Sequence, residues 1–94
     1  MSDVTMYTTR TCPYCVAAKR LLSSRSIAFE EIDVSGDRDK RAWLVDTTGR
    51  RTVPQIFILG RSIGGYEELA ELDRSGELRT MLAAGTTPNA QASS

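Results

Sequence analysis

Residues 4–15 read VTMYTTRTCPYC, and this segment sets the pattern for the rest of the chain. Residues 4–7 are β-prone, and the polar loop that follows them ends at Cys12. Pro13 suits the first turn of a helix, where its missing N–H costs nothing, and residues 16–22 are rich in helix formers. The segment therefore predicts a strand, a loop and a helix whose N-terminus carries Cys12.

Further segments of alternating type follow along the chain. We expect a strand over 27–34, followed by a helix that begins after caps at 35–37 and ends at Gly49. After it we expect a strand over 55–59, a turn at 60–61 and a returning strand at 62–63, and then two short helices that separate at 75–76. Strands linked through helices pair in parallel with right-handed crossovers. The order βαβαββα therefore predicts an α/β thioredoxin fold, a four-stranded mixed sheet with helices on both faces.

The chain of 94 residues is long enough for one compact domain and too short for two. We expect the domain to cover residues 1–84. Residues 85–94 are small and polar, include a proline and hold no large apolar group, so they are expected to form a disordered tail. Trp43 and Phe57 are expected in the core.

Composition restricts the classes of partner. Twelve basic residues balance twelve acidic ones, so no net charge draws the protein to nucleic acid or to an anionic membrane. The first residues lack a basic start followed by an apolar run, and no later apolar run approaches the roughly 20 residues of a membrane span. We expect a cytoplasmic monomer without a nucleic-acid or membrane partner.

The chain has two cysteines, Cys12 and Cys15, in a Cys-x-x-Cys arrangement at the predicted start of a helix. Unpaired N–H groups and the positive end of the helix dipole favour the thiolate of Cys12, which is expected to act as the nucleophile. Cys15 lies one turn inside the helix, close enough to attack a disulfide formed on Cys12. Arg10, Lys19 and Arg20 add positive charge nearby.

Two alternatives exist for this cysteine pair. The first is half of a metal site, but the chain has no histidine and no third cysteine, so tetrahedral zinc lacks its usual ligands unless two chains combine. We therefore expect no metal ligands, while an iron–sulfur cluster shared by two chains stays open. The second alternative, a pair of inert buried thiols, fits poorly with the loop just before the helix.

Three motifs in a fixed order resemble those of a known family. They are Cys12-Pro13-Tyr14-Cys15, Thr52-Val53-Pro54 before a strand, and Gly64-Gly65 followed by an acidic pair. From about residue 4 to residue 82 the chain resembles the dithiol glutaredoxins, in particular the short bacterial type-3 members. The resemblance implies a glutathione-dependent thiol:disulfide oxidoreductase that reduces protein disulfides and glutathione mixed disulfides. It implies glutathione as co-substrate and no tightly bound cofactor, with ribonucleotide reductase as one possible protein substrate.

The resemblance also implies where glutathione binds. In the family the proline at position 54 is cis and turns the backbone of Val53 toward the cysteines, and Gly65 lets the backbone approach the γ-glutamyl end of the ligand. The implied contacts come from Arg10, Tyr14, Arg41, Thr52, Val53, Pro54, Gly65, Tyr66 and Glu67.

The chain departs from the family pattern at three positions, Thr9, Tyr66 and Glu67. Glu67 stands where the family usually has an aspartate that faces the ligand's α-amino group. Thr9 stands where the family commonly has the lysine that meets the glycine carboxylate, so Arg10, or otherwise Arg41, is expected to replace it. The rival functions are a redoxin that uses thioredoxin reductase or another small thiol, and an iron–sulfur carrier dimer.

Overall fold

Four strands form one mixed sheet in the computed structural model, which describes residues 3–86. Their spatial order is β2-β1-β3-β4, with β1 parallel to β2 and antiparallel to β3, and with β3 antiparallel to β4. The strands are β1 (Val4–Thr8), β2 (Glu30–Asp33), β3 (Gln55–Ile58) and β4 (Arg61–Gly64). This topology confirms the predicted fold and the hairpin between β3 and β4.

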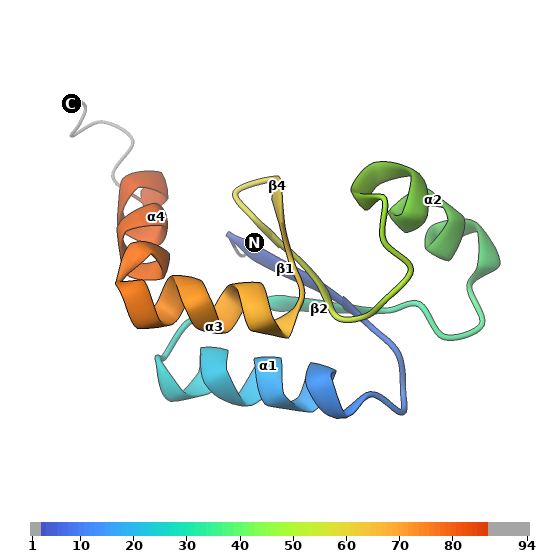
Figure 1. Ribbon diagram of the computed structural model, residues 1–94, viewed down its shortest axis with the longest axis horizontal. Helices are drawn as coiled ribbons and strands as arrows, with labels where there is room; N and C mark the ends of the chain where they lie inside the picture. The colour runs from blue at the N-terminus through green and yellow to red at the C-terminus, as the bar shows by residue number, and fades with distance from the viewer. Residues whose placement is uncertain (1–2, 87–94) are drawn as a thin grey trace.

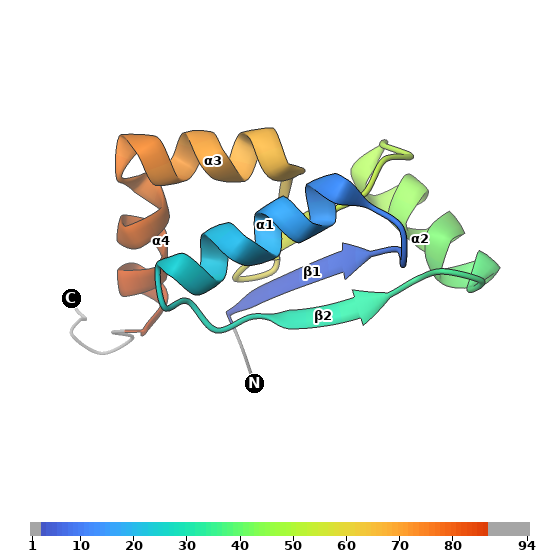
Figure 2. The same ribbon diagram turned by 90° about the horizontal axis from the view of Figure 1, so that it is seen from below.

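Helices cover both faces of the sheet, as the sequence predicts. Figures 1 and 2 show α1 and α3 together on one face and α2 on the other. The helices are α1 (Pro13–Ser24), α2 (Arg38–Thr48), α3 (Tyr66–Ser75) and α4 (Glu77–Thr86). Gly76 separates α3 from α4 with φ of +86°, a conformation that favours glycine, and this confirms the expected break. Within residues 3–86 no helix is long and apolar enough to cross a membrane.

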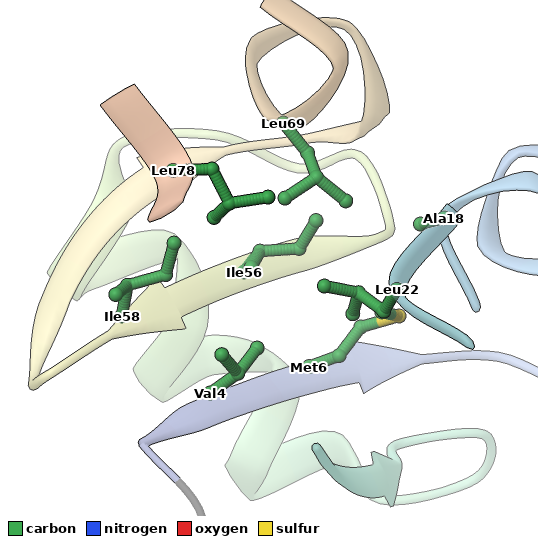
Figure 3. Packing of buried hydrophobic residues seen from close by; sticks show 8 residues of the cluster. All are labelled: Val4, Met6, Ala18, Leu22, Ile56, Ile58, Leu69 and Leu78. Atoms are coloured by element: carbon green, nitrogen blue, oxygen red, sulfur yellow. The ribbon is translucent and has the colours of Figure 1, made fainter. Parts of the chain in front are cut away.

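The hydrophobic core lies between the sheet and the helices α1, α3 and α4 (Figure 3). Alternate residues of β1 and β3 point to this face, because successive side chains of a strand point to opposite sides. The buried cluster consists of Val4, Met6, Ala18, Leu22, Ile56, Ile58, Leu69 and Leu78. The core therefore fixes the starts of α1 and α3 relative to the strands.

The opposite face of the sheet holds an aromatic cluster that α2 covers in part. The rings of Tyr7 and Trp43 are 5.5 Å apart between centroids, and Trp43 stacks on Phe57 at 6.1 Å. Phe57 is half-buried, but Trp43 is 45% exposed. The expectation that Trp43 is a core residue is therefore wrong. One helix on this face leaves the outer side of the indole in solvent.

Some predicted boundaries also differ. The strand expected over 27–34 is confined to Glu30–Asp33, because the N–H groups of Ser26 and Ile27 still donate to carbonyls at the end of α1. Leu59, expected in a strand, lies in the hairpin turn with φ of +53°. Residues 85 and 86 of the expected tail belong to α4, which continues past side chains packed on the core, and residues 87–94 lie outside the described part of the chain.

Leu69→Ala is expected to lower the free energy of unfolding by about 2–5 kcal/mol, because it removes a fully buried side chain between α3 and the sheet. Chemical denaturation followed by circular dichroism measures this change. Val16→Ala is the control, because it trims an exposed side chain of α1 and should change stability by about 0.5 kcal/mol at most. Equal losses in the two variants would contradict this description of the core.

Candidate active site

Strand direction brings three distant segments to one end of the sheet. β1 and β3 are antiparallel with Tyr7 opposite Gln55, so the loop that leads to Cys12 lies beside the segment before β3. β3 and β4 are antiparallel with Ile56 opposite Gly64, so the start of α3 lies at the same end. The three motifs singled out in the sequence therefore meet at this edge.

Cys12 is the N-cap residue of α1, as predicted. Its backbone is extended, with φ of −141°, and its Sγ accepts a hydrogen bond from the N–H of Cys15 at 3.1 Å. The residues in the first turn of α1 include no acidic side chain. An N–H donor and the positive helix end stabilise negative charge on this sulfur, and the residue is partly exposed.

Cys15 lies behind Cys12 and is only 2% exposed. Burial raises the pKa of the Cys15 thiol to about 12, and the hydrogen bond with Cys12 is the second cause. A backbone hydrogen bond at Thr9 and the charge of Lys19 lower the pKa, but by less. Cys15 is therefore less accessible than Cys12, and it ionises less readily than an ordinary thiol. Both are free thiols in this structure.

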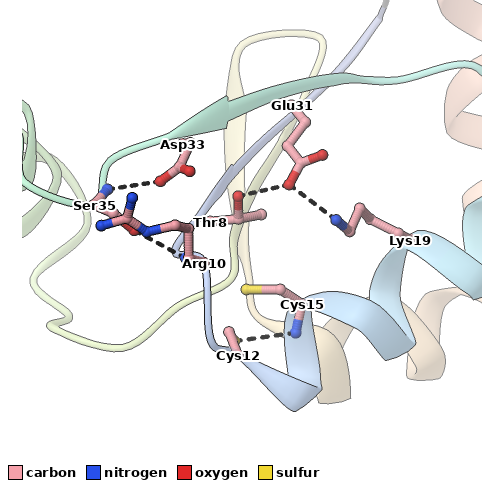
Figure 4. Close-up of polar contacts among 8 residues, drawn as sticks. All are labelled: Thr8, Arg10, Cys12, Cys15, Lys19, Glu31, Asp33 and Ser35. Carbon is pink, nitrogen blue, oxygen red and sulfur yellow. Dashed lines mark hydrogen bonds and ion pairs between the residues drawn. The ribbon is translucent and has the colours of Figure 1, made fainter.

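A polar network lies beside the cysteines (Figure 4). The carboxylate of Glu31 accepts from the hydroxyl of buried Thr8 at 2.8 Å and from the ammonium of Lys19 at 3.0 Å. These two donors outweigh burial and lower the pKa of Glu31, the Thr8 bond being the stronger cause. The network ties β1, β2 and α1 together next to Cys15.

Arg10 lies on the β2 side of this network rather than over the cysteines. Its backbone N–H donates to the hydroxyl of Ser35 at 2.9 Å, and Ser35 in turn donates its N–H to Asp33. The pKa of Asp33 is lowered, first by Ser35 and to a lesser extent by the charge of Arg10. Figure 4 shows the Arg10 side chain beside Ser35, and Arg10 lines neither of the two cavities described below.

The segment before β3 lies against the reactive sulfur. The peptide bond between Val53 and Pro54 is cis, and the carbonyl oxygen of Val53 lies 3.5 Å from Sγ of Cys12, within hydrogen-bonding distance of the protonated thiol. Gln55, which is fully buried, donates from Nε2 to the carbonyl and hydroxyl oxygens of Thr52 at 2.8 and 3.3 Å. We did not single out Gln55 from the sequence, although an amide in an otherwise apolar strand is a signal for such a role.

A first cavity, which we call the Tyr14 cavity, has a volume of about 260 Å³ and brings together most of the predicted contacts. The rings of Tyr14 and Tyr66 lie 6.4 Å apart, and Tyr14 is 60% exposed. A Cβ at Gly65 would lie 3.2 Å from the carbonyl oxygen of Pro54, so glycine allows α3 to approach this segment closely. The lining residues are Tyr14, Arg50, Thr52, Val53, Pro54, Gly65, Tyr66, Glu67 and Glu68.

A second cavity, which we call the arginine cavity, has a volume of about 250 Å³ and adjoins the first. Arg50, Thr52 and Val53 line both cavities, and Arg41 lines only the second. Its charged lining is Arg38, Arg41, Arg50 and Arg51, and its apolar lining includes Val34 and Leu44, which are buried.

Arg50 and Glu68 are site residues that the sequence analysis missed. Glu68 accepts from the N–H of Gly65 at 2.8 Å and forms an ion pair with Arg50 at 3.5 Å. The N–H of Gly65 is the largest cause of the lowered pKa of Glu68. A glutamate three residues after an N-cap is a capping-box signal and could have identified Glu68. Arg50 carries no such local signal.

The arrangement suits thiol–disulfide exchange. An accessible sulfur lies at a helix N-terminus, a second sulfur lies directly behind it, and the backbone of Val53 passes alongside. Across the described residues no group of three or more histidine, cysteine, aspartate and glutamate side chains is placed to hold a metal ion.

Comparisons with known proteins agree with this geometry. The family model for glutaredoxin matches residues 4–63. Glutaredoxin 3 of Escherichia coli K12 is 46% identical over 82 residues, which cover 87% of this chain and 99% of that protein. A glutaredoxin of Pseudomonas aeruginosa is 43% identical over 84 residues, which cover 89% of this chain and all of that protein.

Solved structures show the same fold. The solution structure of glutaredoxin from Brucella melitensis aligns with a TM-score of 0.80 and 42% identity, covering 90% of this chain and 92% of that one. The crystal structure of a buckwheat glutaredoxin–glutathione complex aligns with a TM-score of 0.81 and 32% identity, covering 87% of this chain and 77% of that one. The chain therefore belongs to the glutaredoxin family and is a thiol:disulfide oxidoreductase with a redox-active Cys-Pro-Tyr-Cys centre.

Proposed function

We propose that this protein is a cytoplasmic, glutathione-dependent oxidoreductase that reduces glutathione mixed disulfides and protein disulfides. The observation that carries the proposal is the pair of adjoining cavities beside Cys12, one lined by an acidic helix start and the other by arginines. Glutathione carries two carboxylates and one amino group, which this distribution of charge complements. The buckwheat relative was crystallised with glutathione, which supports the same ligand here.

The proposed pose follows from the positions of the charged groups. The glutathione sulfur meets Sγ of Cys12, and the cysteinyl backbone pairs with the backbone of Val53. The γ-glutamyl carboxylate binds at the N-terminus of α3, where backbone N–H groups favour an anion, and Glu67 faces the amino group. The glycine carboxylate binds Arg41 in the arginine cavity. Arg10 is directed toward Asp33 and Ser35, so we assign this contact to Arg41 rather than to Arg10.

In the first route, the Cys12 thiolate attacks the glutathione sulfur of a glutathionylated protein. The Cys12–glutathione bond forms, the bond to the protein breaks, and the protein thiolate leaves and takes up a proton. A second glutathione thiolate then attacks the bound glutathione sulfur. This step releases oxidised glutathione and restores the Cys12 thiolate. The N–H of Cys15 stays directed at the Cys12 sulfur and stabilises its charge as attacker and as leaving group.

In the second route, Cys12 attacks a protein disulfide and forms a mixed disulfide with one of its sulfurs. Cys15 then attacks Cys12, and the reduced protein leaves as a dithiol. The Cys12–Cys15 disulfide is reduced by two molecules of glutathione. The hydrogen bond and charge from Cys12 help to keep Cys15 protonated in the resting enzyme. Both effects vanish once Cys12 is bonded to substrate, which makes Cys15 a better nucleophile at the moment it is needed.

Cys12→Ser is expected to abolish both activities, by about 10³-fold or more, because it removes the nucleophile. Cys15→Ser is expected to retain reduction of a glutathione mixed disulfide and to lose reduction of protein disulfides. NADPH oxidation coupled through glutathione reductase measures both activities. Turnover that requires thioredoxin reductase instead of glutathione would contradict the proposed reductant, and loss of both activities in Cys15→Ser would contradict the assigned roles.

Arg41→Gln is expected to raise the KM for glutathione by about three- to tenfold with little change in kcat, because it removes one half-exposed ion pair to the substrate. Arg10→Gln is the matched control and should leave this KM unchanged. Steady-state kinetics with varied glutathione measures both variants. The opposite ranking would assign the glycine carboxylate to Arg10.

A further inference from the structure

The arginine cavity contains more positive charge than one carboxylate requires. Arg38, Arg41, Arg50 and Arg51 line it, and none of its described lining residues is acidic. Arg50 is paired with Glu68, whereas Arg38, Arg41 and Arg51 form no ion pair with any described residue. Under the proposed function Arg41 binds the glycine carboxylate of glutathione, which leaves Arg38 and Arg51 without an anionic partner among residues 3–86.

This unpaired charge lies next to the reactive sulfur. Val53 lines the cavity, and its carbonyl oxygen is 3.5 Å from Sγ of Cys12. Under the proposed function, a polypeptide whose disulfide reaches Cys12 pairs with the backbone of Val53, as the cysteinyl backbone of glutathione does. Residues that flank its attacked cysteine therefore come within reach of the cavity.

The cavity has the size and lining for side chains rather than for a whole small molecule. Its volume of about 250 Å³ is below the range of about 300–1,000 Å³ typical of small-molecule sites. Its lining combines the buried apolar residues Val34 and Leu44 with four arginines. Such a lining suits a glutamate side chain, whose aliphatic part packs on apolar residues and whose carboxylate pairs with arginine.

We propose that the arginine cavity is a docking site for acidic side chains of polypeptide substrates, and that Arg38 and Arg51 select disulfides flanked by glutamate or aspartate. The inference rests on the proposed function and extends it from glutathione to the polypeptide. Arg38, in the first turn of α2, and Arg51, in the loop before Thr52, approach the substrate from two separate segments. Their charges also steer acidic substrates toward Cys12 in a salt-dependent manner.

Two synthetic peptides with an internal disulfide test the proposal. They are identical except that the residues flanking the attacked cysteine are glutamate in one peptide and glutamine in the other. Because exposed ion pairs are individually weak, we expect kcat/KM for the glutamate peptide to be about three- to tenfold higher. The difference should lie mainly in KM and should shrink at high ionic strength.

The charge-reversed double variant Arg38→Glu/Arg51→Glu is expected to abolish or reverse this preference. The readout is the ratio of kcat/KM between the two peptides, because any change in the affinity for glutathione affects both peptides equally. Both side chains are exposed, and an acidic residue in the first turn of α2 is favourable for the helix, so the variant is expected to fold. Arg61→Glu is the matched control. It reverses an exposed charge on β4 at the end of the sheet away from Cys12, and the preference should persist.

Equal turnover of the two peptides by the unmodified protein would overturn the inference and leave the proposed function standing. A preference that survives in the double variant would also overturn it. If neither peptide nor a glutathione mixed disulfide is reduced, the proposed function fails and the inference fails with it.

Discussion

The pairing of β1 with β3 determines the geometry of the site. Tyr7 lies opposite Gln55, which places the loop before α1 beside the cis peptide bond before Pro54. A shift of this register by one residue would exchange the faces of β3 and carry Ile56 and Ile58 out of the core. The same burial that stabilises the domain therefore also fixes the distance between Cys12 and Val53.

On this scaffold the start of α1 gives two identical side chains different chemistry. Cys12 caps the helix, faces solvent in part and receives a backbone N–H. Cys15 faces inward and is kept protonated by burial. The first sulfur is suited to attack an incoming disulfide, and the second to react only when a disulfide has formed next to it. The direction of the reaction sequence thus follows from position along one helical turn.

The sequence predicts the parts of the site that depend on local rules. Asp37 caps α2, Gly76 separates α3 from α4, and Pro13 begins α1, as residue type and spacing indicate. Trp43 was misplaced because its exposure depends on how many helices cover one face of the sheet. The strand expected over 27–34 was too long because apolar content alone does not show that the N–H groups of Ser26 and Ile27 bond to carbonyls of α1.

The sequence could not show the distribution of charge around Cys12. A net charge of zero conceals a basic cavity formed by α2 and the loop after it, next to an acidic start of α3. These residues come from separate segments, and only the fold places them side by side. The ion pair between Arg50 and Glu68 links the two cavities, and it too joins residues from separate segments that only the fold brings together.

The most direct test of the difference between the two sulfurs is alkylation of the reduced protein with iodoacetamide, followed over pH and assigned by peptide mass spectrometry. The account predicts that Cys12 reacts alone at neutral pH and that Cys15 reacts only in strongly alkaline solution, because its pKa is raised to about 12. Modification of both cysteines at similar rates near neutral pH, or of Cys15 before Cys12, would contradict it.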